Sequence, residues 1–170
     1  IKESDICRPQ NLYGKSKRLA EKYIIRKFSK HNYNYTIARI FSLAHKNQRE
    51  SYFVPAMIEK LLKSNKKDIN KIDNINHCRD FLNSKDTINA ILMLVRERKT
   101  GIFNIGSGKK ISLSRIIYYL NNFFKKKIKI KHKNRTTFLI ADNTKLRKIG
   151  WKPKYNFFSE LTEILKYKTS

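Results

Sequence analysis

The chain has 170 residues, of which 40% are hydrophobic and 12% aromatic, with 39 Lys and Arg against 13 Asp and Glu. This length and apolar content exclude a disordered protein and suffice for one ordinary domain with a core. No apolar run reaches the roughly 18 residues of a membrane span, and no signal-peptide core is present. We therefore expect a globular, cytoplasmic protein with no membrane partner.

Residues 12–30 are rich in helix formers, with apolar side chains near helical spacing, and predict the first helix. Residues 32–42 are β-branched and aromatic, which is typical of a buried strand. A helix is predicted at 52–63, where Pro55 is tolerated near the first turn. Residues 78–84 then predict a short strand.

The second half of the chain continues the alternation. Asp86 begins an apolar helix at 86–98, where an acid suits the positive end of the helix dipole. A strand and turn follow at 101–108, and Ser112 is expected to cap the next helix. The remaining elements are strands at 128–133 and 136–142, a short helix ending on Gly150, and a helix at 157–167. Such alternation predicts an α/β fold.

The net charge of +26 would ordinarily favour a nucleic-acid-binding protein. Lysine outnumbers arginine by 28 to 11, however, and 22 isoleucines and 16 asparagines accompany it. Lys, Ile and Asn are the residues of A/T-rich codons, so base composition explains much of the excess. The lysines are also spread along the whole chain apart from one cluster at 125–133. We therefore do not expect nucleic acid as the partner.

Cys7 and Cys78 form no disulfide framework, and reduced thiols suit a cytoplasmic protein. His77 precedes Cys78, but no second ligand pair accompanies them, so we predict no metal site and an ordinary loop or strand position. The sequence begins without methionine, in what reads as the middle of a loop. We therefore expect a fragment of a longer chain.

Two Tyr-x-x-x-Lys pairs occur on the first predicted helix, Tyr13 with Lys17 and Tyr23 with Lys27. Residues four apart lie on one face of a helix, and an ammonium beside a phenol favours the phenolate. Such a tyrosine can exchange a proton with a sugar hydroxyl while a nicotinamide exchanges the hydride. With 28 lysines and nine tyrosines, about one such pair is expected by chance, so spacing alone does not choose between them.

The surroundings favour Tyr13. The segment "RPQNLYGKSKRLAEKY" resembles the P-x-N-x-Y-G-x-S-K-x-x-x-E motif of extended short-chain dehydrogenases, the NAD-dependent sugar-nucleotide epimerase/dehydratase family. Five further segments resemble this family in the same order. They are "TIARIFS", "YFVPAMIEKLL", "CRDFLNSKDTINAILML", "GIFNIGSGKKISL" and "ADNTKLRKIGWKPKY".

The resemblance implies the C-terminal part of a Rossmann-like doubly wound sheet plus a smaller substrate-binding subdomain. Residues 1–42 would end the dinucleotide-binding domain, and 43–170 would mainly form the substrate subdomain, with about 77–105 returning to the main sheet. No G-x-x-G-x-x-G or G-x-G-x-x-G phosphate turn occurs in these residues, and "GSGKKI" at 106–111 predicts only a tight turn into a helix. We expect a separate or upstream Rossmann polypeptide, and a homodimer of the complete enzyme.

By the same resemblance, the cofactor is NAD or NADP and the substrate a nucleotide-sugar. Tyr13 would be the general acid/base, Lys17 would assist it and contact the nicotinamide ribose, and Ile40 would also line the cofactor site. The substrate-binding residues would be Ser42, Val54, Pro55, Arg79 and Arg135.

Several of these assignments have structural alternatives. Arg79 and Arg135 would face the substrate diphosphate, but the first could instead pair with Asp80 or Asp86, and the second could be an exposed loop arginine. Val54 and Pro55 could simply begin a helix. Ser42 replaces the family's usual asparagine, and the loop after it differs from the family pattern. Because that loop shapes the pocket, the identity of the substrate stays open. The expected activity is epimerisation, dehydration or keto reduction, with the isolated chain inactive. The alternative is a catalytically inactive, basic binding protein of the same fold that engages nucleic acid or an anionic surface.

Overall fold

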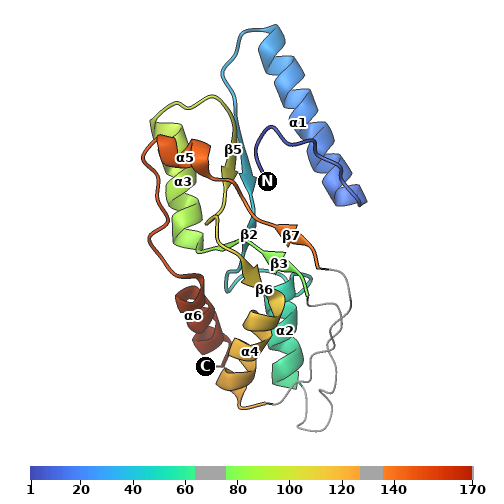
Figure 1. Cartoon of the computed structure of the whole chain (residues 1–170), viewed down its shortest axis with the longest axis vertical. Helices are drawn as coiled ribbons and strands as arrows, with labels where there is room; N and C mark the ends of the chain where they lie inside the picture. Colours follow the sequence, from blue (N-terminus) through green and yellow to red (C-terminus); the bar gives the residue numbers. More distant parts are fainter. Residues whose placement is uncertain (64–75, 127–135, 170) are drawn as a thin grey trace.

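The computed structural model describes residues 1–63, 76–126 and 136–169, in which helices and strands alternate (Figure 1). The helices are α1 (Leu12–Lys30), α2 (Phe53–Lys63), α3 (Ser84–Arg96), α4 (Leu113–Phe124), α5 (Thr144–Lys148) and α6 (Phe157–Thr169). The strands are β1 (Thr36–Ile40), β2 (Ser42–Leu43), β3 (Cys78–Arg79), β4 (Phe81–Leu82), β5 (Gly101–Ile105), β6 (Ile111–Ser112) and β7 (Phe138–Leu139). The predicted strand at 128–133 lies outside the described residues.

Helix α1 begins where its sequence motif predicts. The side chain of Asn11 caps the helix by accepting a hydrogen bond from the Gly14 backbone N–H at 2.8 Å. A Cβ on Gly14 would lie only 3.0 Å from the Cβ of Pro9, so a side chain at this position would crowd the proline. Pro9, Asn11 and Gly14 together therefore place Tyr13 in the first turn of α1.

Parallel strand pairs form the centre of the fold. Strand β1 pairs with β5 in parallel, from Thr36 opposite Gly101 to Ile40 opposite Ile105, and α3 lies in the connection between them. Strands β2 and β4 form a second parallel pair, and β3 lies between antiparallel β6 and parallel β7. This arrangement confirms the predicted α/β class.

The core has two clusters of buried apolar side chains. One joins α2, α4 and α6, which gather at one end of the molecule in Figure 1. The other joins α3, β5, α5 and Trp151, which is 2% exposed. Helix α1 lies at the opposite end in Figure 1 and contributes no buried residue to either cluster. Its apolar residues Leu12, Leu19 and Tyr23 are each at least 67% exposed.

The predicted strand at 78–84 is wrong in one respect, because Asp80 divides it into β3 and β4, which belong to different sheets. The Asp80 side chain is fully buried. Its carboxylate accepts hydrogen bonds from the Ser107 N–H and hydroxyl, at 2.7 and 2.6 Å, and from the N–H groups of Gly108 and Ala141, at 2.9 and 3.1 Å. Asp80 therefore holds the 106–108 turn, whose amide groups point at a carboxylate of the protein itself.

Other boundaries also differ from prediction. Helix α3 begins at Ser84, with Asn83 as its cap, and Asp86 is the third residue of its first turn. The Asp86 carboxylate accepts backbone hydrogen bonds from Lys154 and Tyr155, so it fixes a distant segment as well as suiting the helix dipole. The strand predicted at 136–142 is reduced to the two residues of β7. Ser112 caps α4 as predicted.

An ion pair joins α1 to β1. Arg39 donates two hydrogen bonds of 2.8 Å to the carboxylate of Glu21, and Arg18 donates a third at 3.0 Å. Both side chains of the Glu21–Arg39 pair are only 16% exposed. The hydrogen bond from Arg39 holds the pKa of Glu21 below its ordinary value of 4.5, although burial acts in the opposite direction. The charged form of Glu21 therefore contributes to stability.

Replacing Glu21 by glutamine is expected to lower the free energy of unfolding at neutral pH by roughly 1 kcal/mol. Because the folded pKa of Glu21 is lowered, the stabilisation is complete above about pH 4.5 and disappears as the pH falls through the folded value. Urea unfolding at several pH values measures the difference. Glu97→Gln, in the exposed Arg96–Glu97 pair, is the control. An equal difference at pH 7 and pH 3 would contradict this account.

Candidate active site

A cavity of about 710 Å³ lies among the ends of α1, β1 and α2 and the strands β2 to β4. Five of the predicted site residues line it, namely Tyr13, Ile40, Ser42, Val54 and Arg79. They come from parts of the sequence up to 66 positions apart, and the fold brings them together. The volume falls within the range of small-molecule binding sites.

Tyr13 and Lys17 lie on one exposed face of α1. The ring of Tyr13 is 68% exposed, and the Lys17 ammonium nitrogen lies 5.4 Å from the centre of that ring. Lys17 does not line the cavity, but it flanks the tyrosine that does. The pair is therefore accessible to a ligand that approaches the cavity from α1.

Arg79 is half-buried and has no acidic partner among the described residues. Neither Asp80 nor Asp86 pairs with it, so the ion-pair alternatives are wrong. Its Nη1 instead donates to three neutral oxygens, at 2.9 Å to the Cys78 carbonyl, 3.3 Å to the Thr137 carbonyl and 3.0 Å to the Thr137 hydroxyl. Burial lowers the pKa of Arg79. A partly buried cation that has no acidic partner among the described residues suits an anionic ligand.

The remaining predicted residues differ in position. Ile40 ends β1, where parallel strands commonly present ligands, and Ser42 opens β2. Val54 both lines the cavity and belongs to the buried cluster of α2. Pro55 is buried in the first turn of α2 and does not line the cavity. Arg135 lies outside the described residues.

Sequence reasoning missed Gln48, which also lines the cavity. Its amide oxygen is buried and, in the described part of the chain, receives no hydrogen bond. The divergence of the loop from the family pattern indicated a role in shaping the pocket, but no residue in it stood out by type. An acceptor without a donor suits a ligand that carries a hydroxyl or N–H group.

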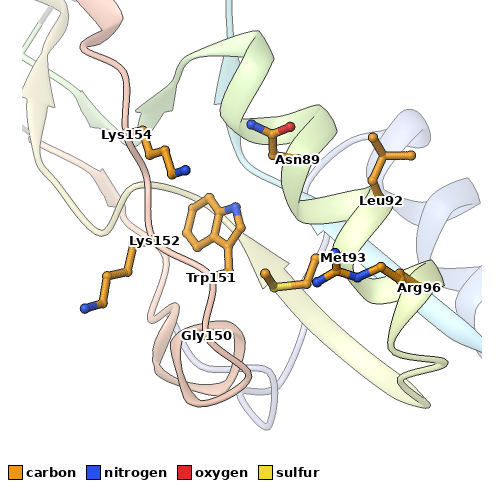
Figure 2. A pocket seen from close by; sticks show the side chains of 8 residues that line it. All are labelled: Asn89, Leu92, Met93, Arg96, Gly150, Trp151, Lys152 and Lys154. Carbon is orange, nitrogen blue, oxygen red and sulfur yellow. The ribbon is translucent and has the colours of Figure 1, made fainter.

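A second cavity, of about 420 Å³, lies between α3 and residues 150–154 (Figure 2). Figure 2 shows Trp151 and Met93 facing each other across it, with Lys152 and Lys154 beside the indole. No predicted catalytic or ligand-binding residue lines this cavity. Because Trp151 is packed into the cluster around β5, its place is structural.

Residues 1–106 match the model of the "NAD dependent epimerase/dehydratase family". This match covers more than half of the chain, and the protein belongs to that family. It is an NAD-dependent family, and the α/β fold agrees with it.

Relatives and solved structures agree with the family. CDP-abequose synthase of Salmonella typhimurium is 26% identical over 148 residues, which cover 80% of this chain and 49% of that protein. The structure of RMD from Pseudomonas aeruginosa complexed with NADPH has a TM-score of 0.85 at 23% identity and covers 99% of this chain and 59% of that one. The UDP-N-acetylglucosamine 4-epimerase of Methanobrevibacter ruminantium, in complex with UDP-N-acetylmuramic acid, has a TM-score of 0.84 at 22% identity and covers 99% and 57%.

These matches establish a Rossmann-like fold for the chain, which spans about half the length of the curated relatives it matches. The curated relatives are named as enzymes of nucleotide-sugar metabolism, which leaves the alternative of a basic binding protein without support. Within the described ranges, no helix combines the length and the apolar character that crossing a membrane requires.

Proposed function

We propose that this chain supplies the acid/base and substrate side of an NAD(P)-dependent enzyme that modifies a nucleotide-activated sugar. The observation that carries the proposal is that Tyr13 and Arg79 line one cavity, a phenol beside a cation that has no acidic partner among the described residues. The reaction would be an epimerisation, a dehydration or the reduction of a keto group. One of the similar solved structures reported above is named as a UDP-N-acetylglucosamine 4-epimerase.

Tyr13 would exchange the proton of a sugar hydroxyl, because its phenol is exposed beside the cavity. Lys17 would stabilise the phenolate and contact the nicotinamide ribose, since its ammonium lies against the same ring. The nicotinamide, when bound, supplies or accepts the hydride. Ile40, which ends β1 at the cavity and is 44% exposed, would contact the cofactor from the other side. These residues fit the nicotinamide end of the cofactor.

Arg79 would bind the diphosphate of the substrate, because its guanidinium is partly desolvated and faces no carboxylate among the described residues. Ser42 and Val54 would line the same site, and the buried oxygen of Gln48 suits a hydroxyl or N–H of the sugar or base. Pro55 would act by orienting the first turn of α2. Arg135 remains a proposed second diphosphate ligand.

The dinucleotide phosphates would bind to a second polypeptide segment, the N-terminal Rossmann half. Two features support this partner. Strand β1 has only β5 beside it in the described part of the chain, so its other edge is open, and α1 exposes Leu12, Leu19 and Tyr23. The relatives are also about twice as long as the region they share with this chain. Residues 1–42 would complete that half, 43–170 would mainly form the substrate subdomain, and about 77–105 would return to the main sheet.

A homodimer of the complete enzyme and a cytoplasmic location are also proposed. The cytoplasmic location is supported by two free cysteines, Cys7 and Cys78, because reduced thiols are usual in that compartment.

Calorimetric titration of the isolated chain tests this division of labour. We expect nucleoside diphosphates to bind, and NAD and NADP to bind weakly or not at all. The control is the same chain combined with the Rossmann half, which should bind the dinucleotide tightly and turn over a nucleotide-sugar. Tight binding of NAD or NADP by the isolated chain would contradict the division, and absence of diphosphate binding would contradict the substrate role.

A further inference from the structure

Arg79 is anchored on one side of its guanidinium and open on the other. All three hydrogen bonds that the structure describes for it use Nη1. Nε and Nη2 donate to none of the described residues, and the side chain lines the cavity that contains Tyr13. Because a guanidinium is planar and rigid, fixing one nitrogen sets the direction in which the remaining donors point.

Thr137 makes two of the three anchoring contacts, one through its carbonyl and one through its hydroxyl. The parallel pairing of β3 and β7 places it there, because Cys78 lies opposite Phe138 and the Cys78 N–H donates to the Thr137 carbonyl at 2.8 Å. The backbone contact needs no particular side chain at this position. The hydroxyl contact, at 3.0 Å, is available only to threonine or serine.

His77 fixes the direction of that hydroxyl. Its Nδ1 lies 2.9 Å from the hydroxyl oxygen of Thr137 and also accepts a hydrogen bond from the Thr137 N–H at 3.3 Å. A hydroxyl has one proton and two lone pairs, and here one lone pair faces the Arg79 donor. With Nδ1 as the acceptor, the hydroxyl proton points to His77 and the lone pair remains directed at Arg79. The three side chains are thus linked by hydrogen bonds, from His77 through the Thr137 hydroxyl to Arg79.

We propose that Thr137, oriented by His77, is a positioning residue that holds the Arg79 guanidinium ready for the diphosphate of the substrate. The inference rests on the proposed function, which supplies the anion. An arginine held in advance loses less rotational freedom when the ligand binds, so the hydroxyl contact raises affinity for the diphosphate and not for the nucleoside. His77, predicted as an ordinary loop or strand residue, acquires a role by this route.

The test measures binding of UDP, CDP, dTDP and GDP to the full chain by calorimetry, followed by the nucleoside of whichever diphosphate binds best. Thr137→Val, which keeps the shape and removes the hydroxyl, is expected to weaken diphosphate binding about tenfold and leave nucleoside binding unchanged. Thr137→Ser should retain most of the affinity. His77→Phe should weaken diphosphate binding in the same direction by a smaller factor.

A double-mutant cycle separates positioning from a general loss of structure. In an Arg79→Ala background, Thr137→Val is expected to cause no further loss of diphosphate affinity, because the group that it orients is gone. If Thr137→Val lowers the diphosphate affinity by the same factor with and without Arg79→Ala, the inference is overturned. It is also overturned if Thr137→Val alone leaves the affinity unchanged. Either result leaves the proposed function standing. If the unmodified chain binds none of the four diphosphates, the proposed function fails and the inference fails with it.

Discussion

Replacing Tyr13 by phenylalanine is expected to lower kcat by about a thousandfold, with KM nearly unchanged, in the enzyme formed with the Rossmann half. Only the phenolic hydroxyl is removed, and it is the proton-transfer group of the proposed mechanism. The ring remains, so the lining of the cavity is preserved. Chromatography of the converted nucleotide-sugar measures turnover, and calorimetry measures substrate affinity separately.

The matched control is Tyr23→Phe. Tyr23 belongs to the same helix, has the same spacing to a lysine and is almost equally exposed, at 67% against 68%. It does not line the cavity, so its replacement should leave kcat unaltered. Equal effects of the two substitutions would show that the Tyr-Lys spacing does not mark the acid/base. Full activity of the Tyr13 variant would remove Tyr13 from the mechanism.

Replacing Asp80 by alanine is expected to lower the free energy of unfolding by about 4 kcal/mol, the largest stability effect that we predict. The carboxylate is fully buried, and its loss leaves the N–H groups of Ser107, Gly108 and Ala141 without their acceptor. The same change releases the connection between β3 and β4. Urea unfolding followed by circular dichroism gives the free energy.

Asp80→Asn offers a finer measurement, because it keeps the volume but retains a single acceptor oxygen, and an intermediate loss is expected. The control is Asp5→Ala, since Asp5 is exposed and accepts one hydrogen bond within a turn. A loss below about 1 kcal/mol for Asp80→Ala would mean that the buried N–H groups find other acceptors.

The parts of the molecule that could be predicted from sequence are those whose cause is local. The bounds of helix α1 were predicted as observed, from its helix formers and the spacing of its apolar residues, and the Asn11 cap at its start is equally local. The class of fold followed from the alternation of periodic segments. The division of the 78–84 segment was not predictable in the same way, because Asp80 finds its partners at Ser107 and Ala141, far along the chain.

The candidate site shows the same limit. The motifs indicated Tyr13 and Arg79 separately, and only the fold places both at one cavity. Thr137 and Gln48 belong to no motif. The proposed role of Thr137 depends on the hydrogen bond that its hydroxyl accepts from Arg79. That of Gln48 depends on a buried amide oxygen that accepts no hydrogen bond among the described residues. Arg79 could be read as part of an ion pair from its neighbours Asp80 and Asp86, yet both carboxylates are fully engaged with backbone N–H groups.

The open edge of β1 also gives the excess of lysine a physical consequence. A strand that has one edge unpaired among the described residues and exposes Ala38 and Ile40 invites a second copy of the chain to add its own strand, which is how many proteins begin to aggregate. Two copies that each carry a net charge of +26 repel one another before their edges meet. Salt weakens that repulsion within a Debye length. A charge that codon usage accounts for therefore also opposes aggregation of the chain through this strand edge.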